Sequence, residues 1–374
     1  MEILFYCFVL RQAQYDKTIK KIVTYSGSRS VKNDKSHAPK NNKNLQNISL
    51  TFFCQIVFYK VPLRQFRNFG IKPLMNVTAA PFSIKQIAID FKEITKAGLA
   101  VSVVFSSIAG YLLGVLDFHD LKFMTLLMLA VGGYCMVGAS NAFNQVIEKD
   151  LDALMDRTKN RPVASGRMST NHALFVASLL TIIGLILLYL INPKSAMFGA
   201  ISIFLYTSVY TPLKQYTPLS VFVGAFPGAI PFMLGWVAAT DDFGIEAGTL
   251  FLIQFFWQFP HFWAIGWFLY EDYEKAGFFM LPTGKKDTST ALQTILYCIW
   301  LLVASMLPSL GYTGRLFLSP VAAGIVFLLG LWMIFYAVRL YQLRTSKAAR
   351  TLMLVSVSYI SLLQMVYIID KFLR

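Results

Sequence analysis

Oxygen-bearing side chains recur at helical spacing in the segment Asn141–Pro162, at the end of an apolar stretch. Asn144, Glu148 and Asp152 are four residues apart, so on an α-helix of 3.6 residues per turn they project from one side. Their oxygen atoms suit a hard cation such as Mg²⁺, which commonly joins one or two carboxylates to substrate phosphates. Ionisable groups beside a bilayer are costly and usually mark a bound ion or a charged substrate. The segment is therefore interpreted as a magnesium and diphosphate site.

Basic residues follow these acids directly. Arg157, Lys159 and Arg161 lie in one short segment, and Lys214 lies in a separate loop between two later apolar stretches. Arginine offers a two-pronged donor for phosphate oxygens and lysine a compact positive charge, so this set could bind a diphosphate. Any single one of them could instead be an anchor at the membrane surface, where Lys and Arg accumulate on the cytoplasmic side. The acids have no such alternative explanation.

A second polar cluster ends the sixth apolar stretch. His261 and Asp272 are eleven residues apart, so a continuous helix would place them on one face, with Glu271 displaced by about 80°. We expect the two acids at the cytoplasmic end of that helix and His261 deeper in the membrane. A lone His among aromatic residues is more often a hydrogen-bonded core residue than a ligand, and the residues alone leave both interpretations open.

The composition indicates a polytopic membrane protein, with 56% hydrophobic and 14% charged residues and a mean hydropathy of +0.55. Stretches of the length that spans a bilayer, about 20 residues, are centred near residues 107, 133, 181, 203, 229, 258, 299, 328 and 361. The backbone inside lipid must satisfy its own hydrogen bonds, and these stretches lack the alternation of a barrel. We therefore expect an all-α bundle of about nine transmembrane helices, forming one domain over residues 76–374.

The loops divide into a basic set and a nearly neutral set. One set of alternate loops holds only Lys122, Lys194 and Arg315. The other holds twelve bases, namely Arg157, Lys159, Arg161, Arg167, Lys214, Lys275, Lys285, Lys286, Arg339, Arg344, Lys347 and Arg350. By the positive-inside rule the basic set is cytoplasmic, which places the N-terminus and the mouth of the site inside and the C-terminus outside. The expected compartment is a bacterial inner membrane, with a mitochondrial inner membrane as the alternative if residues 1–75 are a presequence.

Residues 1–75 differ from the rest of the chain, with thirteen Lys or Arg against three acids and many Asn and Ser. They are open to three interpretations: a disordered basic tail, a targeting segment, or upstream sequence translated from too early a start codon, with Met75 as the true start. This segment and the loop bias account for most of the net charge of +15, so no nucleic-acid partner is expected. The four Cys form no close pair and are interpreted as small apolar residues.

Both acid clusters and Lys214 are expected at the cytoplasmic ends of their helices. They should therefore converge on one opening of the bundle, called the mouth below. An anionic head could bind there while an apolar tail enters the bundle, and an isoprenyl diphosphate has that shape. Breaking its allylic C–O bond sends negative charge onto the departing diphosphate, which metal ions, Arg and Lys stabilise. The allylic cation needs a dry pocket with aromatic rings. The rival from a different class is a transporter or proton relay, which would more often place its charges near the midplane on broken helices.

These motifs resemble the UbiA superfamily of intramembrane prenyltransferases, whose first motif is an Asn followed by Asp at +4 and +8 and then by Asn-Arg-Pro. Asn144, Glu148, Asp152 and residues 160–162 match it. Within the superfamily the sequence is most similar to the heme O synthases, and the matching segments are 157–161, 210–214, 228–236, 260–263 and 271–282. The likeness spans about residues 85–370. The motifs are specific as a set, although each alone would be weak.

The resemblance implies that the two acid motifs hold Mg²⁺ and farnesyl diphosphate, with Glu271 and Asp272 as the second pair of metal ligands. It implies that farnesyl is joined to a vinyl group of heme B and that water is added, giving heme O for terminal oxidases, with heme A synthase or an oxidase assembly as a candidate partner. His261 stands where quinone-forming relatives tend to carry Asp, which makes it a candidate heme contact.

Two departures from the family pattern leave the number of metal ions open: Glu148 replaces an Asp, and residues 269–271 replace a more polar run. The nearest alternative is a prenyltransferase for a quinone precursor or another aromatic acceptor, because the diphosphate half of its site would look the same.

Overall fold

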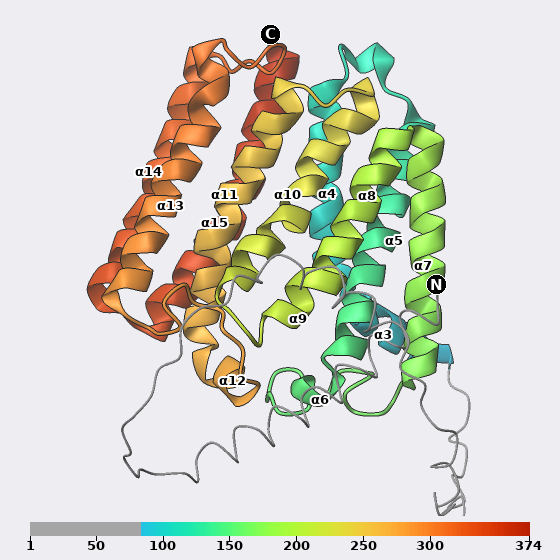
Figure 1. Ribbon diagram of the computed structural model, residues 1–374. Helices are drawn as coiled ribbons and strands as arrows, with labels where there is room; N and C mark the ends of the chain where they lie inside the picture. Colours follow the sequence, from blue (N-terminus) through green and yellow to red (C-terminus); the bar gives the residue numbers. More distant parts are fainter. Residues whose placement is uncertain (1–83) are drawn as a thin grey trace, which may run out of the picture. The chain divides into compact units, whose positions relative to one another are not determined.

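The computed structural model describes residues 84–374, so the predictions made for residues 1–75 lie outside the described residues. The described part contains helices and no strands. Its α-helices are α3 (Ile84–Ile94), α4 (Ala97–Gly114), α5 (Phe123–Ile147), α6 (Lys149–Asp152), α7 (Thr170–Ile191), α8 (Pro193–Phe204), α9 (Thr211–Leu213), α10 (Leu219–Thr240), α11 (Ile245–Phe268), α12 (Tyr270–Lys275), α13 (Thr288–Met306), α14 (Pro320–Leu343) and α15 (Ser346–Leu373) (Figure 1).

Eight stretches of the described residues are long and apolar enough to cross a membrane. One of them, Pro193–Leu213, is composite, because α8 continues through the π-helical turn Leu205–Tyr210 into α9. The remaining predicted span, α11, has 24 residues but carries Gln254, Gln258 and His261, which lower its hydropathy. All nine predicted stretches are helical, and the prediction of an all-α membrane bundle is confirmed.

Successive long helices run in opposite directions, so every second connection lies at the same end of the bundle. Figure 1 shows α6, α9 and α12 together at the lower end, while the C-terminus lies at the upper end. Three segments that are far apart in the sequence therefore meet at one mouth, as the charge pattern predicted.

Two glycines let α4 and α10 approach closely. A Cβ atom on Gly110 would lie 1.9 Å from the carbonyl oxygen of Phe232, and one on Gly235 would lie 1.9 Å from that of Ser107. Small residues at such crossings are typical of membrane helices. Lipid tails are as apolar as the helix surfaces, so these helices associate through close packing rather than through the hydrophobic effect. The crossing joins α4, which follows α3 at the mouth, to the centre of the bundle.

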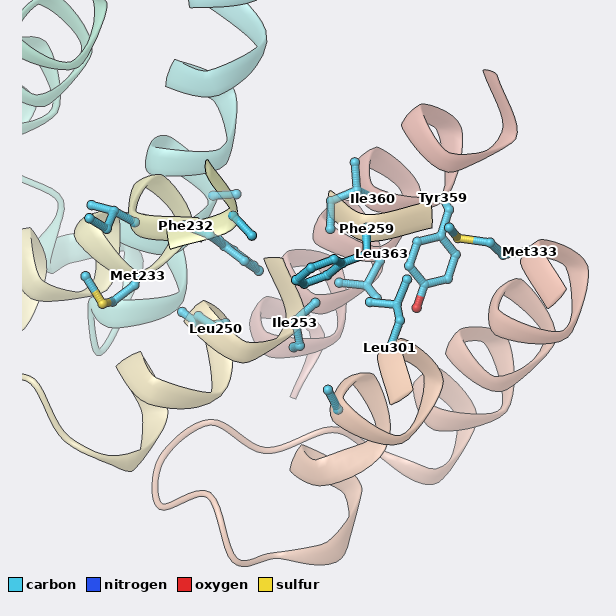
Figure 2. Packing of buried hydrophobic residues seen from close by; sticks show 14 of the residues in the cluster. Phe232, Met233, Leu250, Ile253, Phe259, Leu301, Met333, Tyr359, Ile360 and Leu363 are labelled. Atoms are coloured by element: carbon cyan, nitrogen blue, oxygen red, sulfur yellow. The ribbon is translucent and has the colours of Figure 1, made fainter. Parts of the chain in front are cut away.

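The core continues from α10 through α11 to α13 and α15 (Figure 2). Phe232, Phe259 and Leu363 are fully buried and belong to this one cluster. A polar contact also lies inside it, since the hydroxyl groups of Tyr359 and Ser305 are 2.9 Å apart. This packing fixes α11, the helix that carries His261 and leads to the second acid motif, on several sides.

Candidate active site at the mouth of the bundle

The first acid motif lies at the junction of α5 and α6. Asn144, Glu148 and Asp152 are 1%, 4% and 0% exposed, whereas Asp150 between them is exposed. The helical hydrogen bonds continue through the junction, because Glu148 N donates to Asn144 O at 2.9 Å and Asp152 N donates to Glu148 O at 2.7 Å. The three side chains therefore share the buried side, as the four-residue spacing predicted.

Each carboxylate of this motif is paired with a base from another segment. Lys214 Nζ lies 2.8 Å from Glu148 Oε1. Arg161 Nη1 donates to both carboxylate oxygens of Asp152, at 2.8 and 2.7 Å. Burial raises the pKa of Asp152, and the charge of Arg161 offsets this only in part. The pairs neutralise buried charge, and removing one partner of such a pair typically costs about 3–5 kcal/mol.

Asn144 is oriented by a hydroxyl group. The Thr211 hydroxyl donates to Tyr206 O at 2.8 Å, so its only hydrogen is used there. It can then only accept from Asn144, whose Nδ2 lies 3.2 Å away. This arrangement turns Oδ1 of Asn144, which can only accept, away from Thr211. Thr211 follows the π-helical turn, a feature that is frequent at functional sites.

Lys214 is held from several sides. Its Nζ lies 4.5 Å from the centre of the Tyr210 ring and 5.7 Å from that of Phe278, and its carbonyl oxygen accepts from Phe279 N at 2.8 Å. Burial works to lower the pKa of Lys214, but the Glu148 carboxylate outweighs it and the pKa is raised overall. The ammonium group therefore stays charged.

Asp272, from the second acid motif, binds the backbone of the loop that follows the first. It accepts from Asp156 N at 3.0 Å and from Arg157 N at 3.2 Å. Burial works to raise the pKa of Asp272, but these two hydrogen bonds and Lys275 lower it overall. Asp272 thus fastens α12 to the basic loop.

The same loop carries a surface ion cluster. Asp156 pairs with Lys159 at 2.8 Å and with Lys275 at 2.5 Å, and these hydrogen bonds lower its pKa to about 2. The Arg157 guanidinium lies over the Tyr273 ring, 5.8 Å from its centre. The predicted diphosphate ligands Arg157 and Lys159 therefore lie on the loop, outside the two buried pairs.

The helix from His261 to Asp272 is interrupted at one residue, because α11 ends at Phe268, Leu269 has φ −103° and ψ 19°, and α12 begins at Tyr270. Hydrogen bonds continue through this junction, since Leu269 N donates to Ile265 O and Tyr273 N donates to Leu269 O, both at 3.0 Å. Glu271 has a side chain that is 69% exposed and pairs with Lys286. Within residues 84–374, no three Asp, Glu, His or Cys side chains lie close enough together to hold a metal ion.

The side chain of His261, on α11, faces α15. Its Nδ1 is 2.8 Å from the Ser356 hydroxyl, and its ring stacks on Trp257 with centres 4.7 Å apart. Trp257 Nε1 donates to Ser356 O at 2.6 Å. His261 thus has its own contacts within the bundle, separate from the acid–base pairs at the mouth.

The sequence motifs did not reveal Lys96, which lies between α3 and α4 with a φ of 47°, unusual for a residue with a side chain. This junction is fastened to α5 beside the acids. Asn141 Nδ2 donates to Thr95 O at 3.2 Å. Gln145 Nε2 donates to Glu93 O at 3.1 Å. These contacts bring Lys96 beside the first acid motif, which no local spacing in the sequence could have indicated.

The electrostatics of Lys96 follow from this position. Burial and the positive charges of Arg161 and Lys214 lower its pKa to about 7, against the opposing effect of Glu148 and Asp152. Within residues 84–374, its ammonium group makes no hydrogen bond or ion pair. The site therefore holds three basic side chains around two carboxylates, an arrangement suited to a polyanion.

The donor set fits the predicted metal. Asn144, Glu148 and Asp152 offer only oxygen atoms, and Mg²⁺ prefers such ligands while keeping positions for substrate phosphates. Because no three carboxylates converge within the described residues, a metal ion here would depend on phosphate oxygens to complete its shell. The arrangement can thus bind a diphosphate together with Mg²⁺ and stabilise the charge of a departing diphosphate.

Residues 103–363 match the UbiA prenyltransferase family, and the chain belongs to this family. A protoheme IX farnesyltransferase of Flavobacterium johnsoniae is 80% identical over 300 residues, which are 80% of this chain and 100% of that protein. One of Cytophaga hutchinsonii is 38% identical over 284 residues, which are 75% of this chain and 96% of that protein. The resemblance to heme O synthases that the motifs indicated is confirmed.

Solved structures show the same fold at low identity. A digeranylgeranylglyceryl phosphate synthase superposes with a TM-score of 0.64 at 17% identity, over 77% of this chain and 100% of that one. A UbiA homolog from Archaeoglobus fulgidus bound to DMAPP and Mg²⁺ superposes with a TM-score of 0.57 at 14% identity, over 76% of this chain and 99% of that one.

Proposed function

We propose that this protein transfers the farnesyl group of farnesyl diphosphate to a vinyl group of heme B, with addition of water, to give heme O. The observation that carries the proposal is the pair of buried carboxylate–base contacts at the mouth, in a chain that is 80% identical to a protoheme IX farnesyltransferase. Heme B and farnesyl diphosphate are the substrates, and the bilayer is the environment of the apolar helices.

The buried pairs keep the ligand set neutral before substrate arrives. Glu148 and Asp152 would serve as metal ligands, and Lys214 and Arg161 as phosphate ligands, after leaving the ion pairs that they form with one another. An exchange of partners, with the acids turning to metal and the bases to phosphate, would keep every buried charge compensated. Asn144 supplies a third oxygen, oriented by Thr211.

Mg²⁺ would supply Lewis-acid stabilisation of the negative charge that develops on the departing diphosphate. Lys214 and Arg161 would add to that stabilisation from fixed positions, which avoids the cost of reorienting solvent during bond cleavage. Arg157 and Lys159 would attract the diphosphate from the loop, and Asp272 would hold that loop in place through its two backbone hydrogen bonds. Glu271 would contribute as a metal ligand only after leaving Lys286.

The location of the protein is inferred from the same charges. The basic ends of the helices support a bacterial inner membrane with the mouth facing the cytoplasm. Residues 76–374 would form the catalytic domain, and its product would serve a terminal oxidase, directly or through heme A synthase.

The test uses membranes containing the protein, incubated with heme B, farnesyl diphosphate and Mg²⁺, followed by mass analysis of the extracted hemes. We expect a farnesylated, hydrated heme from the wild type and from Asp150→Asn, whose side chain is exposed. We expect Asp152→Asn to lower the rate at least about 100-fold, the typical size of losing one group that stabilises developing charge. Unchanged turnover by Asp152→Asn would remove the first acid motif from the mechanism.

A further inference from the structure

The hydrogen bonds of Ser356 indicate which nitrogen of His261 carries a hydrogen. The Ser356 hydroxyl lies 2.7 Å from Met353 O, an atom that can only accept, so the hydroxyl hydrogen is used there. Toward His261 Nδ1, 2.8 Å away, the same hydroxyl can therefore only accept. Nδ1 must donate, and in the neutral ring Nε2 then keeps the free lone pair.

Ser356 also holds the neighbour of His261. Its carbonyl oxygen accepts from Trp257 Nε1 at 2.6 Å, and the Trp257 ring stacks on the imidazole at an angle of 18°. Phe262 lies edge-on to the same ring, with centres 5.5 Å apart. One serine on α15 thus fixes the orientation of two rings on α11.

Nε2 of His261 has no polar partner within residues 84–374, and the side chain is half-buried. A histidine with a purely structural role in a membrane bundle would be expected to use both nitrogens, because an unsatisfied polar atom is costly there. A histidine that ligates a metal shows the arrangement seen here, with one N–H bonded to oxygen, which sets the tautomer, and the other nitrogen free.

We infer that Ser356 is a positioning residue for the acceptor half of the site, holding His261 so that its Nε2 can bind the iron of the heme B substrate. The inference rests on the proposed function, because heme is the acceptor only if that proposal holds. Histidine is a common axial ligand of heme iron. His261 lies seven residues before the end of α11, or about 10 Å at 1.5 Å per residue. That depth separates the iron from the diphosphate, so the two substrates would not compete for the same side chains.

The test measures heme binding without farnesyl diphosphate, by visible absorption of the purified protein titrated with heme B. We expect a histidine-ligated spectrum for the wild type and its loss in His261→Ala. Ser356→Ala should weaken heme binding about 10-fold, the lower end of the range for losing a partner of a metal-ligating histidine. Ser356→Thr keeps a hydroxyl group and should restore binding. Ser358→Ala is the matched control on the same helix, because Ser358 is exposed and its hydroxyl donates to Leu354 O of its own helix.

Turnover measurements separate this inference from the proposed function. Ser356→Ala should raise the KM for heme B and leave the KM for farnesyl diphosphate unchanged. Suppose that the wild type makes farnesylated heme, and that Ser356→Ala and His261→Ala both show the heme spectrum and the heme affinity of the wild type. The positioning role is then refuted and the proposed function stands. If the wild type neither binds nor farnesylates heme B, the proposed function falls and this inference falls with it.

Discussion

Replacing Thr211 by valine should impair the metal site without touching a metal ligand. The Thr211 hydroxyl lies 2.8 Å from Tyr206 O and 3.2 Å from Asn144 Nδ2. Valine has nearly the same shape but lacks the hydroxyl group, so both hydrogen bonds are lost. Asn144 is 1% exposed, and leaving its buried Nδ2 unsatisfied costs about 1–3 kcal/mol unless the amide turns. An amide that turns would present Nδ2, a donor, where the cation needs an oxygen.

Either outcome weakens metal binding. We expect the Mg²⁺ concentration for half-maximal activity to rise about 10- to 100-fold, the range seen when a partner of a metal ligand is removed. The assay is farnesyl transfer at saturating substrates over a series of Mg²⁺ concentrations. Mn²⁺ binding in the presence of farnesyl diphosphate, followed by electron paramagnetic resonance, gives a readout that does not depend on turnover.

Thr207→Val is the matched control. Thr207 lies in the π-helical turn that precedes Thr211, is buried, and donates to Ile203 O at 2.7 Å. Its hydroxyl bonds no side chain of the first acid motif among the described residues. The variant should lose a similar helix contact and keep the wild-type Mg²⁺ dependence. Equal Mg²⁺ dependence of Thr211→Val and Thr207→Val would refute the claim that Thr211 orients Asn144.

Two further predictions concern Lys96 and Gly235. With a pKa of about 7 in the free protein, Lys96 should take up a proton when a diphosphate binds, so the affinity for farnesyl diphosphate should decline as the pH rises above about 7. At a pH of about 6.5, Lys96→Met should weaken the affinity for farnesyl diphosphate about 10-fold or more, which is the size of a hydrogen bond to a charged group. The variant should also lose the pH dependence of that affinity. An unchanged binding curve would exclude a contact between Lys96 and the diphosphate. Gly235→Ala should cost about 1–3 kcal/mol of stability, because its Cβ would lie 1.9 Å from Ser107 O, whereas Gly248→Ala has open space and should not. Thermal unfolding in detergent compares the two, and equal unfolding temperatures would contradict the close packing of α4 on α10.

The helices and the first acid motif could be predicted because their signals are local. A span needs a stretch of about 20 apolar residues, and a helical face needs only the four-residue spacing of Asn144, Glu148 and Asp152. Even α11, with its polar side chains, kept enough apolar residues to be recognised.

The partners of Glu148 and His261 could not be predicted, because they come from distant segments. Lys214 was expected to bind phosphate, and the structure pairs it with Glu148, 66 positions away. Ser356 lies 95 positions from His261, and its role depends on how α15 packs on α11. The interruption at Leu269 was not predicted either, since the sequence of this segment predicts a continuation of α11.

The acceptor is the central claim, and a competition between acceptors tests it most directly. Membranes containing the protein are given farnesyl diphosphate, Mg²⁺, heme B and an equal amount of an aromatic quinone precursor, and both possible products are identified by mass. We expect farnesyl only on heme B, with water added, and the quinone precursor unchanged. Farnesyl on the quinone precursor with heme B unchanged would contradict the proposed acceptor while leaving the diphosphate site intact.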